Sequence, residues 1–381
     1  MKKIGFIYLL FCCLPATSQE ISGYINGMPS LFIQLPAGDA YWQMLMHNRL
    51  NFSWQFNEHL HMTIGMRNRL ITGSKFMINA RSIHDDPGWM RLSWNWMDIE
   101  TLSATSLLGN TTLDRLLITF EKNQWKLQAG RQRINWGQTF VWNPHDIFNT
   151  YSFFDFDYPE RSGCDAFRGT FYHTETSSSE LAVSANRHHK VTAAFLHRWN
   201  SHNIDYQLIA GEQTEEDIVL GGALTGDVKG LNLRTELSYF HPVKNLTDTS
   251  GIVAVSLGAD YIFPNSLRLQ TEILYNDVRK TSSGNGLMGL YSAPLSAKNL
   301  SICNWNIFAQ ASYLITPRMN GSLSGMYFVD IQSCYMGLSV DWSVIENLDF
   351  SIIAQFFSSF GNSKLGHMQI LMTFARLKYS F

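Results

Sequence analysis

The chain of 381 residues has little charge and little cysteine. Charged residues make up 16% of it, against about 25% in a typical domain, and the formal net charge is only -2. A nucleic-acid-binding surface needs an excess of basic residues, so nucleic acid is not an expected partner. Beyond Cys12 and Cys13 there are only Cys164, Cys303 and Cys334, an odd number at wide spacing that suits neither a disulfide framework nor a metal site. The sequence therefore predicts no cofactor.

Long hydrophobic runs are also missing beyond the first residues of the chain. No stretch after Leu14 has the run of about 18 apolar residues that a transmembrane helix requires. A membrane protein without such helices must be a closed barrel, because lipid cannot satisfy the backbone groups of an open sheet edge.

The first residues have the three parts of a secretory signal peptide. Met1–Lys3 is basic, Ile4–Leu14 is apolar but too short to span a bilayer, and Ala16–Ser18 offers small residues for cleavage. We expect residues 1–18 to be a signal peptide and residues 19–381 to be the mature chain. The alternative interpretation is a buried strand or helix at the N-terminus.

Apolar and polar residues alternate along most of the mature chain, as they do in strands with one apolar face and one polar, water-facing face. In the stretch 42–56, for example, Trp42, Met44 and Met46 share one face and Gln43 and His47 share the other. Similar stretches recur at 60–70, 92–96, 231–239, 267–275, 305–313 and 336–342. Phe308, Phe357, Met372 and Phe374 fall on nominally wet faces, which indicates a partly filled interior.

The connections between these stretches are of two kinds. Those at 121–124, 263–266, 315–319 and 344–348 are short turns, whereas those at 73–87, 137–162 and 276–299 are long. Short turns at one rim and long loops at the other are typical of outer-membrane barrels, whose long loops are extracellular. The sequence predicts an all-β, transmembrane, antiparallel, up-and-down β-barrel of about 18 strands, with 16 as the alternative count.

A secreted β-sandwich or propeller would also alternate, but its outer faces would carry more charge. Here aromatic residues gather near the ends of the apolar faces, as the interfacial girdles of a barrel require. Examples are Trp42, Phe56, Tyr239, Tyr313, Trp342 and Tyr379. The first stretch, 21–33, contains Pro29, and the sequence leaves open whether it forms a strand or a plug inside the barrel.

The chain ends in the middle of an alternating stretch, on Phe381. In a closed barrel the last strand pairs with the first and leaves no edge. The alternating Leu377, Tyr379 and Phe381 resemble the C-terminal signature of bacterial outer-membrane proteins. That resemblance implies recognition by the barrel-assembly machinery and a location in the outer membrane, in contact with its lipid.

One stretch, 130–168, breaks the alternation and is rich in aromatic residues, which need a surface to pack on. We expect a loop at 137–162 to fold into the lumen and narrow it. Its charged residues and the basic positions of the wall are then candidates for the pore lining, or they pair with each other and fix the loop; both interpretations can hold. The candidates are Arg49, Arg67, Arg69, Arg91, Arg115, Arg131, Arg133, Asp146, Asp155, Asp157, Glu160, Arg161 and Arg168.

The same stretch resembles porin-like outer-membrane barrels of Bacteroidota-type bacteria and, more loosely, alginate-export-like barrels. The motif residues are Gly130, Arg131, Gln132, Trp136, Gly137, Asn143, Pro144, Asp146, Asn149, Glu160, Arg161, Asp165 and Arg168. The resemblance implies a passive or substrate-selective channel and names no substrate.

The distribution of charge adds a hypothesis about the solute. Arginines are dense on the wet faces of the early strands, and Asp205, Glu236, Asp260, Glu272 and Asp341 lie on those of later strands. Opposed basic and acidic walls would set up a transverse field that favours polar or dipolar solutes and biases ion choice. Aromatic rings beside arginines also suit sugars, so we expect small hydrophilic solutes, anionic or carbohydrate.

The function has two alternatives. One is an outer-membrane enzyme of the lipase or protease type, although no serine-hydrolase motif and no zinc-binding His-Glu-x-x-His pattern occurs. The other is a barrel that transports hydrophobic compounds or anchors a surface partner. We expect a channel rather than an enzyme, and the sequence leaves the oligomeric state open.

Overall fold

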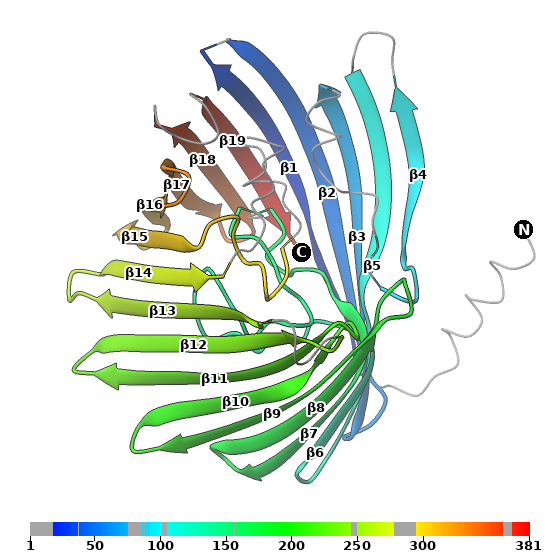
Figure 1. The fold of residues 1–381 in the computed structure, drawn as a ribbon. Helices are drawn as coiled ribbons and strands as arrows, with labels where there is room; N and C mark the ends of the chain where they lie inside the picture. The colour runs from blue at the N-terminus through cyan, green and yellow to red at the C-terminus, as the bar shows by residue number, and fades with distance from the viewer. Residues whose placement is uncertain are drawn as a thin grey trace, which may run out of the picture.

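The computed structural model describes residues 18–36, 38–74, 86, 88–100, 105–154, 157–244, 250–277, 295–360 and 368–381. The signal-peptide prediction for residues 1–18 therefore lies, except for Ser18, outside the described residues. Within the described part, no helix is long and apolar enough to cross a membrane. The chain forms one antiparallel sheet of 19 strands that closes on itself (Figure 1).

The strands follow one another along the chain with few interruptions. Their bounds are β1 Gln19–Leu35, β2 Asp39–Gln55, β3 Leu60–Ser74, β4 Ser93–Glu100, β5 Thr105–Lys122, β6 Trp125–Gln132, β7 Cys164–Thr174, β8 Ser177–Ala185, β9 Val191–Ser201 and β10 Ile204–Gln213. The remaining strands are β11 Asp217–Val228, β12 Leu231–Pro242, β13 Ile252–Ile262, β14 Leu267–Asn276, β15 Trp305–Thr316, β16 Met319–Phe328, β17 Ser333–Ile345, β18 Leu348–Ser359 and β19 Gln369–Ser380.

Eighteen of these strands form the closed ring, and β4 is an extra strand. On one edge β5 pairs with β3 over residues 105–120. On its other edge β5 pairs with β4 over residues 106–112 and with β6 over residues 116–122. The predicted fold class and the count of 18 are confirmed. The stretch 92–96, which we expected to be a wall strand of the ring, instead contributes to β4.

The ring closes where β1 pairs with both β2 and β19. Gly23 and Phe381 exchange two backbone hydrogen bonds of 2.9 Å each, so the last residue is paired with the first strand. The register between β1 and β19 passes from Gly27 directly to Ser30, omitting Pro29, which has no N–H to donate. The stretch 21–33 is thus a strand and not a plug.

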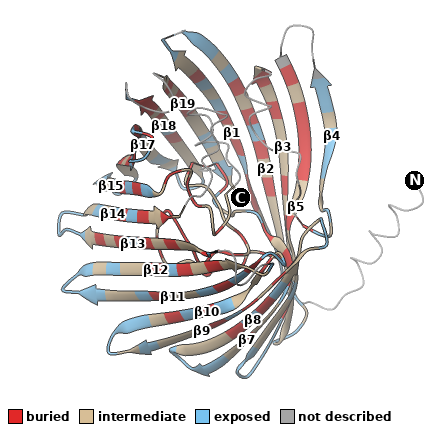
Figure 2. Ribbon diagram, in the orientation of Figure 1, coloured by how far each residue is buried: buried red, intermediate tan, exposed pale blue. Residues whose placement is uncertain are grey.

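The alternation in sequence becomes an alternation between the inside and the outside of the barrel. In β12, Leu231, Leu233 and Leu237 are exposed on the outer face, while Glu236 and Ser238 are fully buried on the inner face. Figure 2 shows the resulting mixture of buried and exposed positions along the strands. An apolar outer face with a polar inner face is the arrangement of a barrel whose outside faces lipid.

The two rims differ as predicted. The turns at 56–59, 123–124, 175–176, 202–203, 229–230, 263–266, 317–318 and 346–347 all lie at one rim. The long connections at 75–92, 133–163 and 277–304 all follow strand ends (Ser74, Gln132 and Asn276) on the opposite side of the sheet. Both Ser18, whose carbonyl accepts a hydrogen bond from the Gln55 N–H, and Phe381 lie at the rim with the short turns.

The seam of the barrel provides a test of closure. A Cβ atom added at Gly23 would lie 2.2 Å from the Arg49 carbonyl oxygen and 3.0 Å from the Phe381 ring. We expect Gly23→Ala to lower the free energy of unfolding by about 1–3 kcal/mol, because the backbone must shift. Gly222→Ala is the matched control, since its nearest neighbour would be 3.6 Å away. The temperature at which each variant changes its electrophoretic mobility in detergent measures its stability. Equal stability of the two variants would contradict the account of the seam.

Candidate functional site in the barrel lumen

Between β6 and β7 the chain leaves the wall and folds inside the barrel (Figure 1). We call residues 133–163 the lumen loop; it contains the segment 137–162 that the sequence marked as a candidate constriction. The loop contacts inward-facing side chains of β8, β12 and β14 on one side and of β2, β3 and β5 on another. It therefore fills part of the lumen rather than projecting from the rim.

Two wall carboxylates bind the backbone of the lumen loop. Glu236 on β12, fully buried, accepts hydrogen bonds from the backbone N–H groups of Gln138, Thr139 (2.8 Å) and His145 (3.1 Å), and from the Thr139 hydroxyl (3.1 Å). A loop without regular secondary structure leaves its N–H groups unpaired unless other groups accept them. Glu236 satisfies three of them with one side chain.

Glu272 on β14 does the same for the next residues of the loop. It accepts hydrogen bonds from the N–H groups of Phe140 (2.8 Å), Val141 (2.9 Å) and Trp142 (2.8 Å), and from the Ser256 hydroxyl (2.8 Å). Bonds to a charged acceptor are stronger than neutral ones. The run 138–142 is therefore held to the wall through its main chain.

The next part of the loop is tied together from within. Asp146 accepts hydrogen bonds from the N–H groups of Trp136 (2.7 Å) and Gly137 (2.8 Å). Burial raises the pKa of Asp146 to about 7, against the lowering effect of these hydrogen bonds, and burial lowers the pKa of His145 to about 4. The Trp136 ring is fully buried, and its indole N–H donates to Glu180 on β8.

On the opposite side of the lumen, a buried ion pair meets the end of the loop. The Arg49 guanidinium on β2 donates two hydrogen bonds to the Asp114 carboxylate, of 2.6 and 3.1 Å, and the Tyr158 hydroxyl donates to the same carboxylate. Asp114 is the extra residue of a β-bulge in β5, since Gly65 pairs with Arg115 and the next residue of β3 pairs with Leu113. A bulge re-aims side chains, which is how Asp114 and Arg115 can both contact the loop.

Further arginines surround the same part of the loop. The Arg67 guanidinium lies 4.0 Å from the centre of the Tyr158 ring and 3.6 Å from the Asp157 carboxylate. Arg115 donates to the carbonyl oxygens of Glu160 (2.5 Å) and Arg161 (3.1 Å). These contacts fix the returning half of the loop against β3 and β5.

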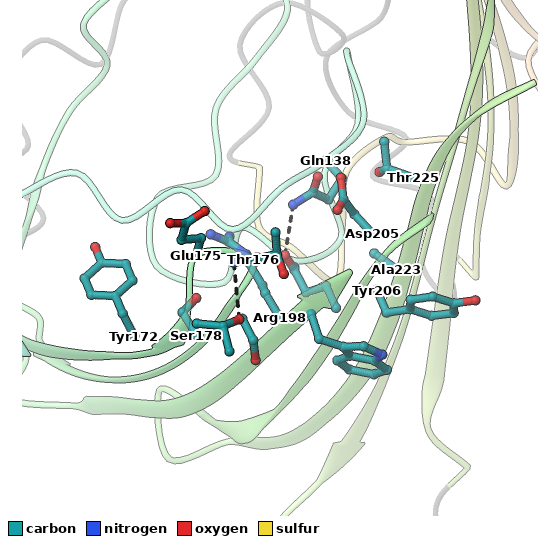
Figure 3. Close-up of a pocket in the computed structure, with 14 residues that line it drawn as sticks. Gln138, Tyr172, Glu175, Thr176, Ser178, Arg198, Asp205, Tyr206, Ala223 and Thr225 are labelled. Carbon is teal, nitrogen blue, oxygen red and sulfur yellow. Dashed lines mark hydrogen bonds between the residues drawn. The ribbon is translucent and has the colours of Figure 1, made fainter. Parts of the chain in front are cut away.

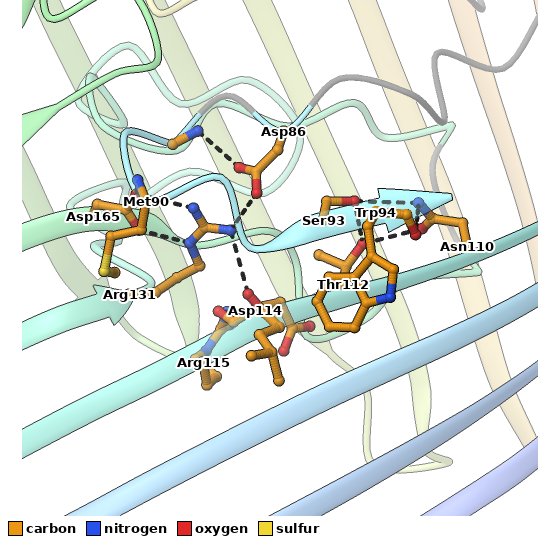
Figure 4. Close-up of polar contacts among 12 residues, drawn as sticks. Asp86, Met90, Ser93, Trp94, Asn110, Thr112, Asp114, Arg115, Arg131 and Asp165 are labelled. Carbon is orange, nitrogen blue, oxygen red and sulfur yellow. Dashed lines mark hydrogen bonds and ion pairs between the residues drawn. The ribbon is translucent and has the colours of Figure 1, made fainter. Parts of the chain in front are cut away.

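A second buried arginine joins the wall to the segment that precedes β4 (Figure 4). Arg131 on β6 binds Asp165 on β7 with two hydrogen bonds of 2.6 and 2.9 Å, and it binds Asp86 at 2.8 Å. Asp165 also accepts the backbone N–H of Met90 at 2.7 Å. Gly88 lies directly against this cluster, where an added Cβ atom would lie 2.1 Å from Arg131.

The aromatic residues of the loop pack on apolar side chains that point inward from the wall. The Phe154 ring lies 5.1 Å from Tyr335 and 5.3 Å from Phe357, and the Trp142 ring lies 6.4 Å from Phe308. Phe308, Phe357, Met372 and Phe374, which break the alternation in sequence, all belong to this buried cluster. The expected partly filled interior is thus present.

The predicted site residues fall into several places. Arg49, Arg67, Arg115, Asp157, Glu160 and Arg161 come together around the end of the loop. Arg131 and Asp146 are the centres of separate clusters, and Arg133 and Arg161 lie over the Tyr151 ring. The last two arginines bind wall residues: Arg168 pairs with Glu180 at 2.5 Å, and Arg69 donates a hydrogen bond to Asn110 at 2.6 Å. Asp155 lies outside the described residues. The pore-lining role of these residues stays a prediction.

Arg91 and the acidic wall differ from what we expected. Arg91 is exposed just before β4, with a φ of 50°, and is not on a strand of the ring. Glu236 and Glu272 do not face the arginines across an open lumen, because they are buried beneath the loop and bound to its N–H groups. The acidic wall that we expected to set up a transverse field therefore does not include Glu236 and Glu272, and the field itself stays a prediction. Nothing in a single sequence signals that an inward glutamate will accept main-chain N–H groups.

Two polar cavities lie beside the lumen loop. One, of about 240 Å³, is lined by loop residue Gln138 and by wall residues that include Arg198, Asp205, Gln207 and Thr225 (Figure 3). The other, of about 430 Å³, lies against Asp157 and Pro159 of the loop and is lined by residues of β1, β2 and β15–β19. Both include residues of the short turns, at 174–177 or 317–319, so they lie toward that rim.

No model of a known protein family matches the chain, and no curated protein matches it in sequence. Solved structures do match it in shape. OccK7 (OpdD) of Pseudomonas aeruginosa superposes with a TM-score of 0.58 at 7% identity, covering 95% of this chain and 99% of that one. OccAB1 of Acinetobacter baumannii gives 0.56 at 8% identity, covering 95% and 97%. The outer membrane protein OprD of Pseudomonas aeruginosa gives 0.53 at 9% identity, covering 95% and 94%.

The chain shares the fold of OprD. At identities of this size the likeness establishes the architecture over nearly the whole chain and leaves the activity to be argued from the lumen.

Docking of the lumen loop by wall carboxylates can be tested by substitution. In Glu272→Gln the side-chain amide places an NH₂ group against N–H donors that need an acceptor, so we expect the loop to detach more often. Trypsin cleavage after Arg133 or Arg161 should then accelerate about tenfold or more. Glu121→Gln, at an exposed glutamate paired with Lys126 at 2.6 Å, is the matched control and should leave the cleavage rate unchanged. Equal rates in both variants would contradict the docking role.

The buried ion pair at the other side of the loop predicts a loss of stability. Asp114→Asn removes the carboxylate that binds the buried Arg49 guanidinium and leaves only the Glu160 carboxylate, 3.9 Å away, so we expect the free energy of unfolding to fall by about 3 kcal/mol. Asp205→Asn, which changes an exposed carboxylate bound to Asn200 at 2.8 Å, should change it by no more than about 0.5 kcal/mol. Urea unfolding in detergent, followed by tryptophan fluorescence, measures the free energy of unfolding of both variants. An effect at Asp114 no larger than that at Asp205 would refute the structural importance of the ion pair.

Proposed function

We propose that the protein is an outer-membrane, porin-like channel for small hydrophilic solutes. The observation that carries the proposal is a closed 18-stranded barrel whose interior holds a docked loop with polar cavities beside it. A barrel of this size has a lumen wide enough to need filling, and a loop folded into it determines what can pass. The charged side chains among the lining residues, such as Arg198 and Asp205 in one cavity and Asp341 and Arg376 in the other, favour hydrophilic over hydrophobic solutes.

The outer surface supports a location in a membrane. Trp305 and Tyr313 lie on the outer face near the two ends of β15, with exposed fractions of 48% and 44%, and exposed Ile307 lies between them. Two aromatic levels separated by an apolar band match the two interfaces of a bilayer. The likeness in fold to the outer membrane protein OprD agrees with this location.

The finer parts of the proposal rest on the sequence. We place the short turns in the periplasm and the long connections outside the cell, as in other outer-membrane barrels. The alternating Leu377, Tyr379 and Phe381 support insertion by the barrel-assembly machinery, and the basic-apolar-small start of the chain supports export by a signal peptide. The motif between Gly130 and Arg168 supports a relationship to the porin-like barrels of Bacteroidota-type bacteria.

Conductance in a planar bilayer tests the proposal. Purified protein should open ion-conducting channels, and reversal potentials in a KCl gradient should be small, because Asp157, Asp341 and Asp349 balance Arg318, Arg376 and Lys378 around the larger cavity. Arg376→Glu should shift the reversal potential toward cation preference. Arg91→Glu, at an exposed position off the ring, is the control and should shift it less. The complete absence of conductance would remove the channel proposal.

A further inference from the structure

Two amide side chains lie side by side on the outer face of the barrel. Asn48 on β2 pairs directly with Asn68 on β3 in the sheet. Both side chains point outward, because His47 and Arg67 next to them in the chain are buried on the inner face and successive strand side chains alternate. Both amides are half-buried, so part of each remains accessible on the surface that faces away from the lumen.

The depth of the pair on the wall follows from the aromatic residues of β2. Trp42 and Trp54 lie on the same face as Asn48 and equally far from it in sequence, each about 20 Å along the tilted strand. The outward residues on either side of Asn48 are Met46 and Leu50, which are apolar. An apolar band between two aromatic levels is the part of a barrel that faces hydrocarbon. The two amides therefore lie near the middle of that band.

Hydrogen bonds within the wall satisfy only part of this pair. The Asn68 amide nitrogen donates to the Asn48 side-chain oxygen at 3.1 Å, and the Thr111 hydroxyl donates to the Asn68 side-chain oxygen at 2.7 Å. The Asn48 amide nitrogen donates to the Tyr24 carbonyl oxygen at 3.4 Å. Each carboxamide nitrogen carries two N–H groups and each carboxamide oxygen accepts two hydrogen bonds. One N–H and one acceptor position of each asparagine thus have no partner among the described residues.

Lipid does not supply the missing partners at this depth. Hydrocarbon chains have no hydrogen-bonding groups, and an N–H left without an acceptor in them costs free energy. The polar groups of lipids lie at the two interfaces, at the levels marked by Trp42 and Trp54, and not in the middle of the apolar band. A partner for Asn48 and Asn68 at this depth is therefore another polypeptide.

A second copy of the same chain matches the pair in depth and in chemistry. All copies cross the membrane in one orientation, so a rotation about the membrane normal brings identical residues together at identical depth. A carboxamide is both donor and acceptor, so the pair is complementary to itself. Ile25, which pairs with Asn48 in the sheet, and Met46 are 49% and 47% exposed beside the amides and offer apolar contact area.

We propose that the outer face of β1, β2 and β3 around Asn48 and Asn68 is the surface through which two copies of this chain associate in the membrane, across a two-fold axis along the membrane normal. The unpaired N–H groups of each copy donate to the amide oxygens of the other, and Ile25 and Met46 pack around them. The inference goes beyond the channel function and rests only on the membrane location proposed with it.

Sedimentation in density-matched detergent tests the role of the amides. The wild type should be a dimer. The double variant Asn48→Leu with Asn68→Leu keeps the outer face apolar and similar in volume, and its dissociation constant should rise about tenfold or more. Thr235→Leu is the matched control, because Thr235 lies between exposed Leu233 and Leu237 on the outer face of β12; it should retain the wild-type association.

Cross-linking in the membrane locates the contact without changing the amides. In a background without the native cysteines, Met46→Cys should be joined into dimers by a short bifunctional thiol reagent. Leu257→Cys is the control, since Leu257 on β13 is similarly exposed, at 51% against 47% for Met46, and should stay monomeric. This result also decides the matter where detergent dissociates the wild type.

The outcomes separate this inference from the channel proposal. Absence of a cross-link at Met46→Cys, or equal cross-linking at Leu257→Cys, overturns the contact surface. Association of the double variant as tight as that of the wild type overturns the role of the amides, and a wild type that sediments as a trimer overturns the two-fold arrangement. Dimers without conductance in a planar bilayer remove the channel function and leave the contact, whereas conductance without dimers does the reverse.

Discussion

The requirement that every buried backbone N–H find an acceptor governs this molecule twice. In the wall, it is met by closing eighteen strands into a ring, so that Phe381 pairs with Gly23 and the seam between β1 and β19 has no open edge. In the lumen, it is met by carboxylates. The run 138–142 has no neighbouring strand, and Glu236 and Glu272 accept its N–H groups instead. Closure of the barrel and placement of the loop are thus two solutions to one constraint.

The inside of the barrel combines two kinds of contact with different consequences. Apolar side chains such as Phe308 and Phe357 pack against the aromatic part of the loop and fill one region of the lumen. Charged clusters around Arg49 and Arg131 position the loop and the segment before β4. The polar cavities lie beside the loop, toward the short-turn rim. The loop is therefore anchored on several sides, and the cavities are bounded by groups that are already held in place.

The sequence predicts the wall well and the lumen poorly, for a physical reason. Lipid imposes a strict two-residue period on every strand and the turns are short, so strand count, closure and the two kinds of rim could be read directly. The sequence did not predict that β4 lies outside the ring, because Trp94 and Trp96 alternate with polar residues as they would in a ring strand. The short β6 pairs only with residues 116–122 of β5, and β4 pairs with residues 106–112, which β6 does not reach. The bulge at Asp114 and the pairing of inward charges depend on contacts between distant segments, which no local period encodes.

Docking through main-chain N–H groups has an evolutionary consequence. Every residue except proline carries the same N–H, so Glu236 and Glu272 hold positions 138–142 whatever side chains stand there. A half-buried side chain such as Gln138 could therefore be exchanged while the loop kept its path, whereas Trp142 is also held by its packing against Phe308. The wall carboxylates would then be the slowly changing part of the lumen, and the less buried loop side chains the part that diverges.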